Sequence, residues 1–281
     1  EFNKYQTSPE FKLINVGMDL AGFKAIFWLE YAHRILGKFI GIFIILPAAY
    51  GYIKKYFVNE TWPILICALV MMQGLLGWYM VKSGLINNPH VSHYNLASHL
   101  FCAAILYSVI IWRILVYSPC TNRPTAILPG ISPLLNCLLA LTFLQIIMGA
   151  FVAGLKAGLV YNQFPLMGES FIPIELNYWN INLLSDPVFI QFLHRIIAYL
   201  ILALSLITSY KLYKYKLYNY AIMLLLAPLA QTILGIVALI YHVPLVIALL
   251  HQSGSIVLLS VILFIRYCST PENQYSVTKA L

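Results

Sequence analysis

Seven long apolar runs follow one another along the 281 residues of the chain. A helix needs about 20 apolar residues to cross the hydrocarbon core of a bilayer, and it satisfies its backbone polar groups internally there. The runs cover approximately residues 26–53, 62–81, 94–116, 134–153, 188–209, 219–240 and 244–265. The sequence therefore predicts an all-α polytopic membrane protein with seven transmembrane helices.

The charge distribution indicates how the chain is oriented in the membrane. Charged residues make up only 9% of the chain, against about a quarter in a typical soluble domain. The net charge of +8 comes from cations in short connections, which orient membrane proteins, so we expect no nucleic-acid partner. These cations follow the first, third and fifth runs and occupy the C-terminal tail. We therefore expect the C-terminus on the positive-inside face and the N-terminus on the outer face.

The five cysteines show no spacing typical of a metal site. Cys67, Cys102 and Cys137 lie in apolar runs, whereas Cys120 and Cys268 lie on the predicted inner side. Because the outer connections contain no cysteine, we expect no structural disulfide.

The two halves of the chain carry the same polar residues in the same order. His-Arg opens one run, Gln-x-x-x-Gly lies in the next, and a lone His opens the third. The first half has His33-Arg34, Gln73-x-x-x-Gly77 and His99, and the second half has His194-Arg195, Gln231-x-x-x-Gly235 and His251. Three matches in register indicate a parallel internal repeat.

The repeat also suggests a longer parent protein. The second half begins with the run 134–153, which holds another Gln145-x-x-x-Gly149. The loop-like stretch 1–24 stands in the equivalent place of the first half. We therefore expect a parent of eight spans, arranged as two pseudo-repeated four-helix bundles, whose first helix preceded Glu1.

This organisation divides the chain into five segments. We expect residues 1–24 to form an outer loop segment and residues 25–118 an N-terminal half. Residues 119–133 would form an inner linker. Residues 134–268 would form a C-terminal half, and residues 269–281 an inner tail.

Four histidines occupy one depth in the predicted membrane. His33, His99, His194 and His251 lie near the outer ends of their runs, roughly 7–12 Å below the outer boundary at about 1.5 Å per residue. Polar groups at such depth normally face the bundle interior. Two such residues per half suit two bis-histidine heme sites, and the glycines on the intervening runs would admit a flat macrocycle or another helix.

These histidines also allow other interpretations. They could serve packing or hydrogen bonding alone. A zinc site is disfavoured because no cysteine or second carboxylate joins the set. His90, His93 and His242 lie in outer connections, where we expect solvated side chains.

One carboxylate breaks the symmetry of the repeat. Glu30 lies three residues before His33 on the same helix face, and its counterpart before His194 is Gln191. No other acidic residue falls within an apolar run. A carboxyl group at this place suits proton handling, and the alternative is an ion pair with Arg34 or Lys38. The expectation is that the first half holds the reactive site and the second half a supporting cofactor.

Two arginines follow the histidines that open their runs. Arg34 and Arg195 are candidates for pairing heme propionates. Snorkelling of their side chains to the membrane surface is an equally good interpretation.

Several strings resemble the heme A synthase family. They are EYAHR at 30–34, GLLGWYMVKSG at 74–84, FVAGLKAGLVYNQFP at 151–165 and HQSG at 251–254. The N-terminal stretch 1–15 is similar to the family's first outer loop. The resemblance covers essentially the whole chain and is closest to the mitochondrial and alphaproteobacterial form.

The resemblance implies a function and a set of site residues. That family oxidises the C8 methyl group of heme O to a formyl group, giving heme A for cytochrome c oxidase. It implies a resident heme b on His194 and His251, and the heme O substrate near His33 and His99 with Glu30 as the catalytic carboxylate.

The resemblance also implies partners and a location. The electron donors would be a ferredoxin and its reductase, and heme O synthase would supply the substrate. The location would be the mitochondrial inner membrane or the bacterial cell membrane, with the heme sites toward the intermembrane space or periplasm. The sequence leaves open whether the protein forms a homo-oligomer.

Two other functions compete with this one. A di-heme b-type membrane electron carrier that moves electrons across the bilayer needs a heme near each face. Here all four histidines are predicted to lie near one face. A transporter built from parallel repeats would have broken helices and charged groups near the midplane, and the sequence shows only isolated prolines such as Pro47 and Pro228.

Overall fold

The computed structural model describes residues 1–84, 90–117, 128–177 and 182–269. Seven of its helices are long and apolar enough to cross a membrane. They are α3 (Leu20–Ile53), α4 (Trp62–Gly84), α5 (His93–Tyr117), α6 (Ile131–Gly154), α7 (Pro187–Lys214), α8 (Tyr218–Ile240) and α9 (Leu245–Cys268). Apart from an isolated bridge between Met167 and Ser170, the described residues contain no β-structure. The predicted all-α polytopic fold is confirmed.

The N-terminal segment is more helical than the sequence suggested. Residues 1–24 contain the short helices α1 (Phe2–Tyr5) and α2 (Pro9–Leu13), and α3 already begins at Leu20. Asp19 caps α3, since its Oδ1 accepts a hydrogen bond of 2.8 Å from the Gly22 amide. With 34 residues, α3 is about 50 Å long, which exceeds the roughly 30 Å core of a bilayer. Its capped first turns therefore extend past the apolar run.

The chain divides into two compact units, Glu1–Leu106 and Tyr107–Ala280, here called unit 1 and unit 2. The division falls within α5. The halves 25–118 and 134–268 stay a prediction, because most of the linker between them lies outside the described residues.

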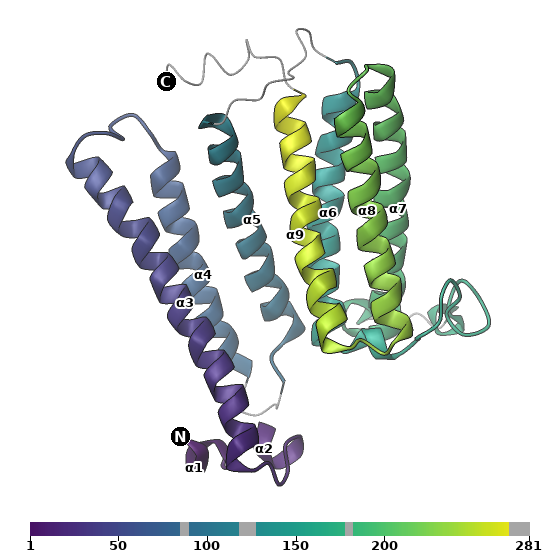
Figure 1. The fold of residues 1–281 in the computed structure, drawn as a ribbon. Helices are drawn as coiled ribbons and strands as arrows, with labels where there is room; N and C mark the ends of the chain where they lie inside the picture. The colour runs from purple at the N-terminus through teal and green to yellow at the C-terminus, as the bar shows by residue number, and fades with distance from the viewer. Residues whose placement is uncertain (85–89, 118–127, 178–181, 270–281) are drawn as a thin grey trace. The chain divides into compact units, whose positions relative to one another are not determined.

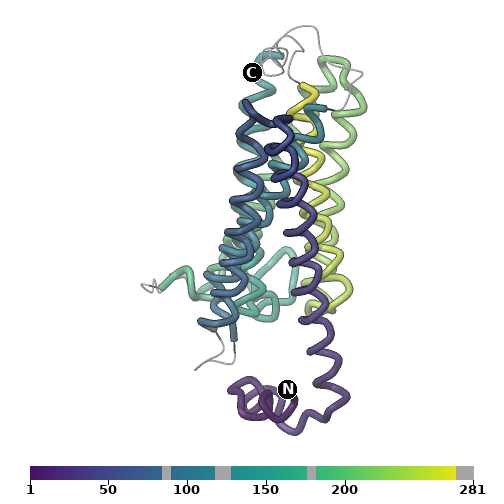
Figure 2. The backbone as a smooth tube through the Cα atoms, turned by 90° about the vertical axis from the view of Figure 1, so that its left-hand side faces the viewer, coloured from purple at the N-terminus to yellow at the C-terminus, as the bar shows by residue number. Residues whose placement is uncertain are grey.

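Unit 2 contains an antiparallel four-helix bundle. Figures 1 and 2 show α6 to α9 running side by side. The connections from α7 to α8 and from α8 to α9 are short, whereas a long connection joins α6 to α7. Each of these helices packs against two others in the order α6, α7, α8, α9 and back to α6, so α7 and α9 lie on one diagonal and α6 and α8 on the other. Leu135 and Leu138 of α6, Leu224 of α8 and Leu259 of α9 are fully buried in its core. This arrangement places side chains from the two helices of each diagonal opposite one another across the core.

Unit 1 is built on the pair α3 and α4, which pack along each other. The short helices α1 and α2 lie against the N-terminal end of α3 (Figure 1). Aromatic rings hold α1 there, since the ring of Phe23 in α3 lies at a tilt 5.2 Å from that of Phe2 and 5.1 Å from that of Tyr5. The first turns of α5 meet α4 through a polar contact described below.

The cysteines differ from expectation at one position. Cys67, Cys102 and Cys137 are free, but Cys268, the last residue of α9, is disulfide-bonded. The expectation that no structural disulfide forms was wrong, because it was argued from the outer connections and Cys268 lies at the opposite end of its helix. Cys120 lies outside the described residues.

Candidate functional site

Two histidines face each other across the core of the four-helix bundle in unit 2. His194 comes from α7 and His251 from α9, the two helices of one diagonal. Their ring centres are 6.5 Å apart and the ring planes are inclined by 72°. Both side chains are half-buried. The structure therefore brings together the pair that the sequence predicted for this half.

A glutamine and a glycine from the neighbouring helix form the surface on which His194 lies. Gln145 and Gly149 are one turn apart on α6 and so share a face of that helix. The Gln145 amide nitrogen lies 3.2 Å from Nε2 of His194 and donates to the His194 carbonyl at 3.0 Å. A Cβ atom added at Gly149 would lie 3.5 Å from Cε1 of the ring. Gly149 therefore lets the imidazole lie close to the α6 backbone.

Part of this arrangement recurs around His251. Gln231 and Gly235 lie one turn apart on α8, and the Gln231 amide donates to the His251 carbonyl at 2.8 Å. A Cβ atom at Gly235 would lie only 2.8 Å from Cε1 of the ring, closer than real Cβ contacts. The sequence suggested that such glycines admit a macrocycle or a helix, but here their close neighbour is the imidazole itself.

Unit 1 holds a related contact, in which the glutamine meets the histidine ring nitrogen. Gln73 and Gly77 lie on α4, and the Gln73 amide nitrogen is 3.1 Å from Nε2 of His99 on α5. A Cβ atom at Gly77 would lie 3.0 Å from Cε1 of that ring. His33 on α3 is exposed, yet it is close enough to His99 for their charges to interact. The described residues contain no cluster of three or more potential metal ligands, so the histidines occur as pairs.

Glu30 forms an ion pair with Arg34 one turn further along α3. The two side chains are 49% and 57% exposed, respectively. This is the arrangement that the sequence offered as the alternative to proton handling. Whether Glu30 also has a catalytic role stays a prediction.

Gln191, the residue of unit 2 that is equivalent to Glu30, makes different contacts. Gln191 is only 3% exposed, and its amide donates to the Tyr161 carbonyl at 3.0 Å. The guanidinium of Arg195 donates to the same carbonyl at 3.1 Å and to that of Leu166 at 3.2 Å. Both side chains therefore attach the connection between α6 and α7 to the part of α7 that carries His194.

Further contacts fix this connection to the bundle. The Asn162 amide donates to the carbonyls of Gly158 and Leu239, each at 2.8 Å. The Tyr161 hydroxyl donates to the Glu175 carboxylate at 2.6 Å. That hydrogen bond raises the pKa of Tyr161 and lowers the pKa of Glu175, because it favours the protonated phenol and the ionised carboxylate.

Comparison with known proteins places the chain in a family. The model of the COX15-CtaA family, described as cytochrome oxidase assembly protein, matches residues 1–263. Proteins named Heme A synthase from Rickettsia felis and Rickettsia bellii are 43% and 44% identical to it over 278 and 276 residues. Each alignment covers 94% of this chain and 81% of the relative. The chain belongs to the COX15-CtaA family.

The names of these COX15-CtaA relatives imply a heme group. The histidine pair of unit 2 has a geometry that fits such a group. A metal ion bound to an imidazole nitrogen on each side, at about 2 Å from each nitrogen, separates the two ring centres by roughly 6 Å. The observed 6.5 Å matches that separation. Nδ1 of both His194 and His251 is buried without a hydrogen-bond partner among the described residues. Packing alone gives no reason to bury two such rings opposite each other.

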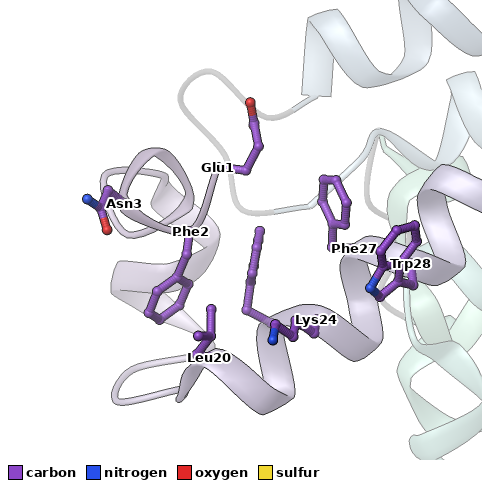
Figure 3. A pocket seen from close by; sticks show the side chains of 8 residues that line it. Glu1, Phe2, Asn3, Leu20, Lys24, Phe27 and Trp28 are labelled. Carbon is purple, nitrogen blue, oxygen red and sulfur yellow. The ribbon is translucent and has the colours of Figure 1, made fainter.

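In this member of the COX15-CtaA family, unit 1 has two hollows near the N-terminal end of α3. Phe2, Leu20, Lys24 and Trp28 line a cavity of about 480 Å³ (Figure 3). A second cavity of about 360 Å³ lies beside Glu30 and Arg34 and is lined by aromatic rings, namely Phe23, Phe27 and Tyr31. The carboxylate of Glu30 thus borders a hollow that these aromatic rings line together with charged side chains, among them Lys4 and Glu10.

The remaining histidines of this COX15-CtaA chain mostly lie where the sequence placed them. His90 and His242 are exposed in connections, but His93 is the first residue of α5 and is half-buried. Sequence reasoning missed the contacts of the glutamines with the histidines and of Gln191 and Arg195 with the connection. The recurring Gln-x-x-x-Gly motif could have indicated the contacts between glutamines and histidines. Nothing in the sequence identified the backbone carbonyls that accept hydrogen bonds from Gln191 and Arg195.

Proposed function

We propose that the chain is a heme A synthase, an oxidoreductase that converts the C8 methyl group of heme O to a formyl group. The observation that carries the proposal is the pair His194 and His251, which face each other across a bundle core at an iron-compatible separation. A second pair, His33 and His99, lies in unit 1 with Glu30 one turn away. A chain with two histidine pairs and a carboxylate at one of them suits a cofactor site and a reaction site.

His194 and His251 would hold a heme b by its iron. A heme bound there supplies a centre that takes up and releases one electron at a time. Gln145 and Gln231 fix the backbones of the two histidines to the neighbouring helices. Gln191 and Arg195 hold the connection between α6 and α7 beside His194, which would limit the access of water to this site. Arg195 would reach a propionate only by releasing these carbonyls.

His33 and His99 would bind the substrate heme O, and Glu30 would handle protons. Oxidation of a methyl to a formyl group replaces two C–H bonds by a C=O bond. This four-electron oxidation would need an external oxidant such as dioxygen, and the protons of the two C–H bonds would need an acceptor near the reacting carbon. A carboxylate near that carbon can accept a proton at its oxygen. In the resting arrangement Arg34 occupies that carboxylate, and a heme propionate that attracts Arg34 would free Glu30 for this role.

The partners and the orientation follow from the family resemblance and the charges. The proposed electron donor is a ferredoxin with its reductase, and heme O synthase would supply the substrate. The last turns of α7 and α9 carry Lys211, Lys214 and Arg266, which favours the inner side for these ends. The histidines at the opposite ends would face the intermembrane space or the periplasm.

A di-heme electron carrier remains the second candidate. The observation in its favour is the ion pair of Glu30 with Arg34, which accounts for the carboxylate without any chemistry.

Coexpression of the chain with a source of heme O, followed by pigment analysis of the purified protein, separates the two functions. Formation of heme A supports the synthase. Stoichiometric b-type heme without heme A would support the carrier, and a purified protein without heme would exclude both.

A further inference from the structure

In two places of the described structure a glutamine amide nitrogen meets the ring nitrogen of a histidine on another helix. Gln73 of α4 lies 3.1 Å from Nε2 of His99, and Gln145 of α6 lies 3.2 Å from Nε2 of His194. The two contacts occur in different units of the chain, at equivalent positions of a Gln-x-x-x-Gly motif. A carboxamide NH₂ group can only donate a hydrogen bond. The ring nitrogen that it meets must therefore be the acceptor.

This contact decides where the proton of the neutral imidazole lies. A neutral imidazole carries one N–H and one lone pair, so a ring that accepts at Nε2 is protonated at Nδ1. Nδ1 of His99 and of His194 is buried and has no hydrogen-bond partner within the described residues. A metal-ligating histidine normally has its tautomer fixed by an acceptor for the other ring N–H. Here the glutamine donor is the group that sets it.

We propose that Gln73 and Gln145 are positioning residues that reserve the Nε2 lone pair of His99 and His194 for heme iron. Each amide holds the ring in the Nδ1–H tautomer while the site is free of heme, and it withdraws from Nε2 when iron binds there. Gly77 and Gly149 support this contact. Because glycine has no side chain, the rings of His99 and His194 can lie against the helices that carry Gln73 and Gln145. The identity of the metal group rests on the proposed function, whereas the tautomer does not.

Gln231 provides an internal comparison. Its amide donates to the His251 carbonyl at 2.8 Å, as Gln145 does to the His194 carbonyl. For Gln231 the structure gives no hydrogen bond to the ring. The tautomer of His251 is therefore not set by Gln231. A substitution of Gln231 removes the same kind of contact between helices without touching a ring nitrogen, which makes it a matched control.

The test is ¹⁵N NMR of histidine-labelled full chain, prepared without heme in detergent micelles. In the wild-type protein we expect His99 and His194 to be protonated at Nδ1. The Gln145→Leu variant removes the donor, so the ring of His194 should move toward the Nε2–H tautomer that free neutral histidine prefers. Gln231→Leu should leave the tautomer of His251 unchanged. Gln73→Leu tests His99 in the other unit and decides the question if Gln145→Leu does not fold.

Heme binding gives a second readout. When the variants are reconstituted with heme, Gln145→Leu should bind it about tenfold more weakly than the wild-type chain, as is typical when the group that orients a metal ligand is lost. Gln231→Leu should lose less.

Two results would overturn the proposal. One is a wild-type His194 that carries its proton on Nε2. The other is an equal loss of heme in Gln145→Leu and Gln231→Leu with unchanged tautomers, which would reduce the glutamines to contacts between helices. A wild-type chain that binds no heme would refute the proposed function, while the tautomers measured without heme would still decide this inference.

Discussion

The side-chain amide of Gln191 donates a hydrogen bond of 3.0 Å to the main-chain carbonyl of Tyr161. The equivalent residue of the repeat is Glu30, which accepts a hydrogen bond from Arg34 instead. An ionised carboxylate cannot donate to a carbonyl, so a glutamate at position 191 could not make the contact that Gln191 makes. This acid-to-amide difference between the halves therefore has a physical consequence. In unit 2 the amide holds the connection between α6 and α7, whereas in unit 1 the carboxylate pairs with Arg34.

The contact predicts that Gln191→Glu loosens the connection between α6 and α7. The variant loses a buried hydrogen bond and leaves the acceptor with Arg195 alone, which should reduce the local stability of the connection by about 1–3 kcal/mol. Hydrogen exchange of the amides in residues 158–167 measures this effect. Gln252→Glu, at an exposed position of α9, makes the same chemical change without a comparable contact. Equal exchange in the two variants would show that Gln191 does not hold the connection.

The close approach of Gly77 to His99 predicts a sharp difference between two glycines of α4. A Cβ atom at Gly77 would lie 3.0 Å from the His99 ring, whereas one at Gly74 would meet nothing within 4 Å. Glycine to alanine stabilises an open helix position by up to about 1 kcal/mol. Gly74→Ala should therefore keep or raise thermal stability, and Gly77→Ala should displace the ring and weaken heme binding at His99. A heme titration that gives the same affinity for both variants would contradict this prediction.

The helices could be predicted from the sequence because a bilayer demands both length and apolarity of each span. The N-terminal end of α3 was less visible, since the cap at Asp19 extends the helix beyond its apolar run. All four histidines and the repeat were visible, because polar residues stand out in apolar runs. The glutamine partners of His99 and His194 were not, because contacts between helices depend on how each helix is rotated in the bundle.

The hydrogen bond between Tyr161 and Glu175 predicts a pH dependence of the same connection. The pKa of Glu175 is lowered from 4.5, so the folded connection gains stability from the carboxylate above pH 4.5 and loses it as the pH falls through the lowered value. The pKa of Tyr161 is raised from 10, so its contribution is complete below pH 10 and is lost as the pH rises through the raised value. Limited proteolysis across the pH range measures both limits. Tyr161→Phe should remove this dependence, and a profile unchanged by that substitution would rule the bond out as its cause.

The ion pair of Glu30 with Arg34 makes the catalytic assignment of Glu30 testable against its structural alternative. Both side chains are about half exposed, so breaking the pair should change the free energy of unfolding by only about 0–1 kcal/mol. If Glu30 handles protons, Glu30→Gln should lower the rate of heme A formation by about 10²- to 10⁴-fold while heme at His194 and His251 is retained.

Arg34→Gln is the matched control, because it breaks the same ion pair and leaves the carboxylate in place. A propionate contact of Arg34 would appear in this variant as a raised KM for heme O with a largely retained kcat. The assays use detergent-solubilised full chain with heme O and a ferredoxin-based electron supply, and they report kcat and KM separately. If Arg34→Gln lost as much kcat as Glu30→Gln, the ion pair itself would be the functional unit. If Glu30→Gln kept full activity, Glu30 would have no part in the chemistry.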